Sequence, residues 1–273
     1  MSAASSTHPP LSVSGPPLAP LGQSGSERAK RAQELAAQMT AGRVPPTFTC
    51  ISAHDMFNDD TPLAMLDRFD LKCSNGMPPC HCSERGLVTC DDDCVNYAMN
   101  MDCDSTICST WGAQQGGCRN THLSSVLDNV TGCIDDSCSV RDAGRKGLGL
   151  FATQPIKSGT VVGVYLGELI TEQELRLRTQ MAARHSTKLN PLGMRYFAKL
   201  AKDAIIDAKF RGNFTRFANN GGKKESNCKM VKWCRKDHVR AKGRYLQYLC
   251  LQAICDIAID EEITFDYGSA FNA

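Results

Sequence analysis

The spacing of hydrophobic positions changes at about residue 139. From there on, short runs rich in Val, Ile, Leu and aromatic residues alternate with glycines and charged turns, a pattern typical of β-strands. Strands are predicted at residues 147–151, 160–165, 167–170, 196–197, 204–208, 244–257 and 263–267. Many short strands with little helix predict a β-rich α+β fold instead of a doubly wound α/β fold.

Two helices are predicted among the remaining patterns. Residues 171–184 contain no Gly or Pro and begin with Thr171 and Glu174 at capping-box spacing. Residues 26–39 form a short amphipathic pattern inside a polar N-terminal arm, residues 1–45, whose first 25 residues are rich in Ser, Pro and Gly and are predicted to be disordered. The apolar residues scattered over 46–74 are predicted to pack on the segment that follows.

Composition excludes several classes of protein. With 273 residues, 42% of them apolar, the chain can bury one substantial core and a small satellite module. No apolar run approaches the roughly 18 residues that a membrane span needs. We expect no secretory leader either, so the cysteines are predicted to be reduced, which favours metal binding over disulfides.

Seven cysteines are concentrated in one stretch of 39 residues. Seven thiols cannot pair evenly into disulfides, but they suffice for two tetrahedral zinc sites if one sulfur bridges both ions. Buried free thiols are the alternative, because Cys is often buried; this density of cysteines favours the zinc cluster. The seven are Cys80, Cys82, Cys90, Cys94, Cys103, Cys108 and Cys118.

The cysteine pattern, which ends in Cys118-Arg-Asn120, resembles the AWS zinc module, here residues 75–122. That resemblance implies one zinc ion on Cys80, Cys82, Cys90 and Cys94. It implies a second ion on Cys90, Cys103, Cys108 and Cys118, with Cys90 as the bridge. A linker is expected over 123–138, in which packing or surface roles are favoured over metal binding for Cys133 and Cys138.

Five further motifs follow in a fixed order, at residues 146–149, 165–168, 206–208, 212–219 and 265–267. Together with the cysteine module they resemble SET-domain protein-lysine methyltransferases. The resemblance implies a SET catalytic domain over 139–273, with short sheets and a knot-like C-terminal core. It also implies S-adenosylmethionine as cofactor and a narrow channel for the substrate lysine.

The resemblance assigns roles to three aromatic residues. Tyr267 is expected at the point of methyl transfer, with Tyr165 opposite it in the channel. Phe265 leaves more room than the tyrosine that some relatives have there, which favours higher methylation states. Core packing remains the alternative role for both tyrosines.

The same resemblance predicts a cofactor site. Gly147 and Gly149 would let the backbone approach the cofactor closely, and Leu148 stands where the family usually has Trp. An ion-pair role for Arg216 remains equally open. The predicted set is Lys146, Gly147, Leu148, Gly149, Tyr196, Arg216, Phe217, Asn219 and Asn220.

The segment from Asn219 to Cys228 departs from the family pattern. It is two residues longer, Asn220 replaces a histidine, and Gly222 replaces a cysteine. We therefore expect the post-SET tail and its third zinc ion to be absent. Cys228, Cys234 and His238 invite a metal interpretation, but strand packing is favoured.

A basic stripe follows this segment, and its role stays open between contact with DNA phosphates and a solvated hairpin. The stripe consists of Lys223, Lys224, Lys229, Lys232, Arg235, Lys236, Arg240, Lys242 and Arg244. Resemblance thus predicts a nuclear, chromatin-bound methyltransferase acting on histone H3 in the nucleosome, at the lysine of tail position 36. The alternatives are an inactive SET-domain chromatin-binding protein and a non-histone protein-lysine methyltransferase.

Overall fold

The computed structural model describes residues 49–50, 79–87, 89–91, 93–112, 117–129, 137–184, 196–237 and 244–268. The predicted helix at 26–39 and nearly all of the packing segment 46–74 lie outside these ranges, as do Cys133, His238, Arg240 and Lys242. Within the described ranges, no helix has both the length and the apolar character needed to traverse a bilayer.

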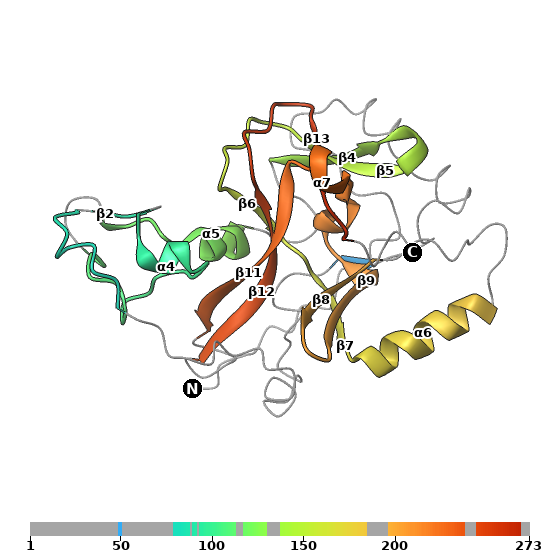
Figure 1. The fold of residues 1–273 in the computed structure, drawn as a ribbon, viewed down its shortest axis with the longest axis horizontal. Helices are drawn as coiled ribbons and strands as arrows, with labels where there is room; N and C mark the ends of the chain where they lie inside the picture. The colour runs from blue at the N-terminus through green and yellow to red at the C-terminus, as the bar shows by residue number, and fades with distance from the viewer. Residues whose placement is uncertain are drawn as a thin grey trace, which may run out of the picture.

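The larger sheet has seven strands and surrounds β13, the last strand described (Figure 1). β13 pairs antiparallel with β5 and parallel with β11 and β10. β11 and β12 form a long hairpin, and β12 pairs antiparallel with β6 on its other edge. The strands are β4 (Cys138–Asp142), β5 (Leu148–Ala152), β6 (Val161–Val164), β10 (Asn219–Asn220), β11 (Cys228–Asp237), β12 (Arg244–Ala253) and β13 (Glu262–Phe265).

A smaller sheet contains β1 (Thr49–Cys50), β7 (Gly167–Ile170), β8 (Phe197–Ala201) and β9 (Ala204–Gly212). Helix α6 (Glu172–Arg184) leaves the end of β7 (Figure 1). Its first turn is capped as predicted, because the Glu174 amide donates to the Thr171 hydroxyl at 3.1 Å. The predicted helix is confirmed.

One arginine ties α6 to this sheet. The guanidinium of Arg178 donates to carboxylates of Glu168 on β7 at 2.7 Å, Glu174 at 2.9 Å and Asp207 on β9 at 2.9 Å. The Asp207 side chain is only 8% exposed, so it depends on this cation for compensation of its charge.

The cysteine-rich segment forms a small module at one side of the molecule (Figure 1). It contains β2 (Thr89–Cys90), β3 (Gly117–Cys118) and α4 (Val95–Ala98). Helix α5 (His122–Asn129) follows, in the segment predicted as a linker. Leu123 of α5 is fully buried in the same hydrophobic cluster as Val161 and Trp233, so α5 helps to hold the module on the larger sheet.

The described residues bury two main hydrophobic clusters. One contains Trp233 and Tyr248, and the other contains Leu150 and Ile263. Short helical turns complete the fold at Gly144–Lys146, Phe214–Phe217 and Gly222–Glu225 (α7). Strands dominate and helices are few, so the predicted β-rich α+β class is confirmed.

Candidate active site and cysteine cluster

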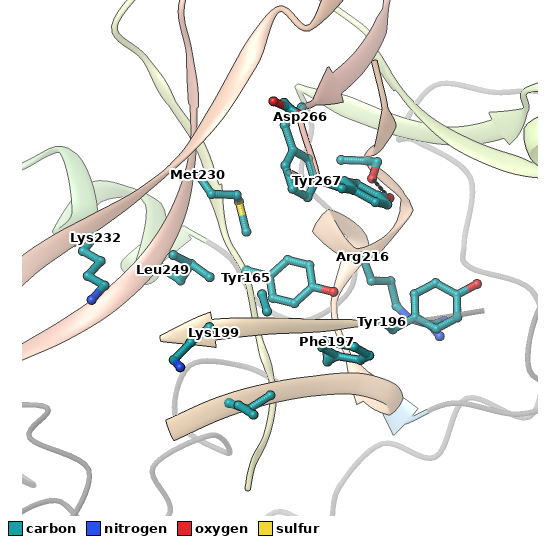
Figure 2. Close-up of a pocket in the computed structure, with 14 residues that line it drawn as sticks. Tyr165, Tyr196, Phe197, Lys199, Arg216, Met230, Lys232, Leu249, Asp266 and Tyr267 are labelled. Carbon is teal, nitrogen blue, oxygen red and sulfur yellow. Dashed lines mark hydrogen bonds between the residues drawn. The ribbon is translucent and has the colours of Figure 1, made fainter. Parts of the chain in front are cut away.

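A cavity of about 500 Å³ lies between β8, the β11–β12 hairpin and the segment after β13. Five residues predicted from the sequence line it: Tyr165, Tyr196, Arg216, Phe265 and Tyr267. Figure 2 shows Tyr165 at the centre of the group, with Met230 and Leu249 on one side and Arg216 and Tyr196 on the other. These residues, which come from six separate parts of the chain, therefore share one mostly apolar chamber.

Tyr267 is held at both ends by the strand pair β10–β13. Its amide donates to the Asn220 side-chain oxygen at 3.3 Å, and its hydroxyl donates to the Ala218 carbonyl at 2.7 Å (Figure 2). The rings of Phe265 and Tyr267 lie 4.6 Å apart between centroids. Because the hydroxyl proton is used by Ala218, the phenol oxygen has lone pairs left to accept a hydrogen bond from a ligand.

Tyr165 is buried at the end of β6, where its amide donates to the Leu249 carbonyl at 2.8 Å. Burial, and then the neighbouring Tyr267, raise the pKa of Tyr165 well above its usual value. Burial also raises the pKa of Tyr267. Both phenols therefore stay neutral at physiological pH, and neither supplies a phenolate base.

Arg216 lies at one end of the cavity against aromatic rings. Its guanidinium carbon is 4.0 Å from the Tyr196 ring centroid and 5.1 Å from that of Phe217, and its Nη2 donates to the Lys209 carbonyl at 2.9 Å. Burial lowers the pKa of Arg216, yet a guanidinium remains cationic in proteins. Stacking on Tyr196 and the hydrogen bond to the Lys209 carbonyl together hold this side chain in place.

The other predicted cofactor residues do not line the cavity, and several of them meet around Glu262 of β13. Asn219 donates its side-chain amide to the Leu148 carbonyl at 3.0 Å and to Glu262 Oε1 at 2.9 Å. Lys146 Nζ donates to Glu262 Oε2 at 2.9 Å. Glu262 was not among the predicted site residues. The only sequence signal that could have pointed to Glu262 is the predicted strand that follows it, because the residues that Glu262 joins are far away along the chain.

The positions of Gly147 and Gly149 each require a glycine, but for different physical reasons. Gly147 has φ +82°, a conformation that favours glycine. A Cβ on Gly149 would lie 2.8 Å from the Cβ of Ala143 and 2.9 Å from Glu262 Oε1, so close packing of protein atoms already requires a glycine there. Phe217 is buried in the core.

The cysteine cluster has the spacing of a metal centre. The sulfur of Cys90 lies 3.4 Å from that of Cys82, 3.6 Å from that of Cys80 and 3.7 Å from that of Cys103, while Cys94 and Cys103 are 3.8 Å apart. Thiolates on a tetrahedral zinc ion with bonds of about 2.3 Å lie about 3.8 Å apart. The donor set therefore fits zinc.

Two overlapping groups of four sulfurs lie close enough to hold a metal ion. Cys90 and Cys103 belong to both groups; Cys80 and Cys94 complete the first, and Cys108 and Cys118 the second. The second group is the predicted one. In the first group, Cys103 stands where Cys82 was expected, although Cys82 remains next to Cys90.

Cys103 receives side-chain hydrogen bonds from two buried asparagines. The amides of Asn96 and Asn120 each donate to its sulfur at 3.4 Å. Hydrogen bonding from Cys118, together with these amides, lowers the pKa of Cys103 to about 5. The thiolate is thus favoured at a position shared by both groups, as a metal ligand requires.

The predicted basic stripe divides in space. Lys223 and Lys224 on α7 and Lys229 and Lys232 on β11 are exposed, and Lys232 also lines the cavity. Lys236 instead donates to the Thr106 hydroxyl at 3.0 Å in the cysteine module. Arg235 is half-buried, and the side chain of Arg244 is outside the described part of the chain.

The described residues near Cys228 supply no metal-ligand group. Cys228 and Cys234 are buried in β11, and the metal-competent groups among the described residues all belong to the cysteine cluster. Cys228 is a free thiol packed in the strand, whereas Cys234 is disulfide-bonded, so the prediction that the cysteines are reduced is wrong for Cys234.

Comparison with known proteins identifies the family to which this part of the chain is similar. Residues 147–268 match the family model of the SET domain. These residues form a SET domain. The residues that line the cavity are therefore its central chamber, and the cysteine cluster precedes the SET domain in the chain. The resemblance inferred from the five motifs is confirmed.

The SET domain has relatives among curated proteins. A mouse (Mus musculus) protein named histone-lysine N-methyltransferase NSD3 is 30% identical over 253 residues, 89% of this chain and 15% of the relative. A human (Homo sapiens) protein named histone-lysine N-methyltransferase, H3 lysine-36 specific, is 28% identical over 253 residues, 89% of this chain and 8% of the relative. A Cryptococcus neoformans protein of the same name is 28% identical over 283 residues, which cover 95% of this chain and 30% of the relative. The chain thus spans less than a third of the length of each.

Proposed function

We propose that this protein is an S-adenosylmethionine-dependent protein-lysine N-methyltransferase that acts on histone H3 in nuclear chromatin, at the lysine of tail position 36. The observation that carries the proposal is the aromatic chamber of the SET domain, in which the neutral phenols of Tyr165 and Tyr267 meet. Relatives named as H3 lysine-36-specific histone-lysine N-methyltransferases support the substrate.

The chamber suits the side chain of lysine. Its apolar walls accommodate the methylene groups and disfavour the ammonium form, which lowers the pKa of the amine. The Tyr267 oxygen accepts a hydrogen bond from the neutral amine, which aligns the nitrogen lone pair for in-line attack. Phe265 adds no further hydroxyl, so room remains for an amine that already carries methyl groups. Higher methylation states are proposed for this reason.

The residues around Glu262 suit the amino-acid part of the cofactor. Lys146 offers a cation, Glu262 an anion and Asn219 an amide, which together match a zwitterion, and Gly147 adds no side chain nearby. When bound, S-adenosylmethionine supplies a methyl group already activated on a sulfonium. The protein's contribution is to orient both reactants and to exclude water.

The cysteine module is proposed to hold two structural zinc ions with Cys90 as the shared thiolate. Sites with four thiolate ligands have no open position for chemistry, which assigns the metals a folding role. Contacts with nucleosomal DNA are proposed for the exposed lysines, because each ammonium near a phosphate adds salt-sensitive affinity. These are Lys223, Lys224, Lys229 and Lys232.

A methyl-transfer assay tests the proposal. The zinc-loaded protein is incubated with radiolabelled S-adenosylmethionine and either nucleosomes, free histone H3 or a nuclear extract, and mass spectrometry locates the product. Methylation of H3 at position 36 is expected, with the Tyr267→Phe variant as the impaired control. Methylation of another protein alone would overturn the substrate. Nucleosome binding without any methyl transfer would overturn the activity and favour the inactive chromatin-binding alternative.

A further inference from the structure

The shared metal-ligand candidate Cys103 lies between two aspartates that both reach the SET domain. The carboxylate of Asp102 is 2% exposed and accepts the indole N–H of Trp233 on β11 at 2.9 Å. It also accepts the amides of Leu123 at 3.0 Å and Ser124 at 2.6 Å at the start of α5. One buried carboxylate thus joins the cysteine module to a helix and a strand of the larger sheet.

Asp104, on the other side of Cys103, reaches the same hairpin at a second point. The hydroxyl of Tyr245 on β12 donates to Asp104 Oδ2 at 2.6 Å, and Lys236 Nζ on β11 lies 4.0 Å from Oδ1. The backbone adds a further link, because the Asp102 amide donates to the Cys234 carbonyl at 2.9 Å. Both strands of the hairpin are therefore attached beside one metal ligand.

The other part of this hairpin forms a wall of the cavity. β11 and β12 pair without interruption from Cys228↔Ala253 to Asp237↔Arg244. Met230 and Lys232 of β11 and Leu249 of β12 line the chamber (Figure 2). The Leu249 carbonyl also accepts the amide of Tyr165. A displacement of the hairpin therefore moves this wall of the chamber.

We propose that Asp102 and Asp104 are positioning residues that couple metal binding at Cys103 to the shape of the lysine chamber. A metal bond at Cys103 fixes the backbone of both neighbours, and their carboxylates hold the hairpin in the orientation that places Leu249 and Tyr165. The inference rests on the proposed function for the role of the chamber. Lys146 lies in the turn Gly144–Lys146, and Glu262 lies on β13, which meets the hairpin only at the Cys228↔Phe265 pair, so the coupling is expected to act mainly on the acceptor substrate.

The variant Tyr245→Phe tests this coupling, because it removes the hydroxyl that donates to Asp104 and because Tyr245 does not line the cavity. Asp93→Asn is the matched control, since Asp93 is an exposed aspartate of the same module. Hydrogen–deuterium exchange is measured on the zinc-loaded full chain, on peptides covering 160–168 and 246–253. Zinc release to a chromogenic chelator and steady-state kinetics are measured on the same samples.

The coupling predicts changes at both ends of the hairpin in Tyr245→Phe. We expect exchange in both peptides and the rate of zinc release to rise at least about twofold, and the KM for nucleosomes to rise by a similar factor. The KM for S-adenosylmethionine is expected to stay within error of the parent, as are all values of Asp93→Asn. If Tyr245→Phe fails to fold, Lys236→Gln makes the milder perturbation and the same results are expected.

Two outcomes would overturn the inference. Faster zinc release with unchanged exchange in both peptides means that the aspartates only stabilise the cysteine module. Unchanged zinc release and exchange mean that the ties carry no coupling. A parent protein without methyl transfer would instead reject the proposed function, and the exchange and zinc measurements would still decide whether the two ends are coupled.

Discussion

Replacement of Tyr267 by phenylalanine removes a single oxygen from the centre of the chamber. The ring keeps its place beside Phe265, because the two rings already pack at 4.6 Å. What the variant loses in stability is the hydrogen bond to the Ala218 carbonyl, which contributes a net free energy of unfolding of about 1 kcal/mol. For a domain of this size, that corresponds to a melting temperature lower by about 2–4 °C.

The expected effect on catalysis is larger than the effect on folding. In the proposed mechanism the lost oxygen is the acceptor that orients the substrate amine, and most of the remaining chamber wall is apolar. We expect turnover to fall at least about tenfold, which is about 1.4 kcal/mol in the activation free energy. Cofactor affinity should hardly change, because the Lys146–Glu262 group does not contact this hydroxyl.

Three measurements separate these effects: kcat on nucleosomes, the Kd of S-adenosylmethionine by calorimetry, and the melting temperature. Tyr97→Phe is the control, since Tyr97 is a half-buried phenol of the cysteine module that packs on Trp233 away from the cavity. Its turnover should equal that of the parent. Equal turnover for Tyr267→Phe and the parent would refute the reasoning and leave Tyr267 as a core aromatic.

Three further outcomes are expected. Metal analysis should return two zinc ions per chain, and Cys90→Ser should lose more zinc than Cys82→Ser because Cys90 belongs to both sulfur groups; one ion or none in the parent contradicts the cluster. Arg178→Gln removes the compensation of three carboxylates and should lower the free energy of unfolding by about 1–2 kcal/mol, against about 0.5 kcal/mol or less for the exposed Arg176→Gln, as measured by urea denaturation. The methyl-transfer rate should rise with pH as the substrate lysine loses its proton. The rate should not fall again at any pH up to about 10, because burial keeps both chamber phenols protonated. A fall in rate that begins near pH 9 would show that one of the phenols ionises early.

Local sequence patterns were sufficient for β5, β6 and β7, whose bounds lie close to the predicted ranges, and for α6, whose cap lies beside the helix it caps. They were insufficient for α5. The carboxylate that caps α5 belongs to Asp102, 21 residues before Leu123, and the burial of this short helix depends on Trp233 in a distant strand. Local propensity contains no information about partners at such separations.

The candidate site divides in the same way. Motif order identified Tyr165, Arg216 and Tyr267, which the structure brings to one cavity. It missed Glu262, because the value of that carboxylate lies in its contact with Lys146, 116 residues earlier in the chain. The prediction of one continuous basic stripe was wrong for a further reason. Residues that are neighbours in the sequence of a twisted strand have different surroundings, so Lys232 lies at the cavity and Lys236 at the cysteine module.

The central position of β13 has a consequence for biosynthesis. Its partners β5 and β11 are made long before it, so a nascent chain that ends before Glu262 presents two unsatisfied strand edges where the middle of a sheet belongs. Pairings of such high contact order form slowly. The segment that carries Tyr267 is thus also the one that completes the sheet. A growing polypeptide therefore stays prone to aggregation until β13 has been made and has paired.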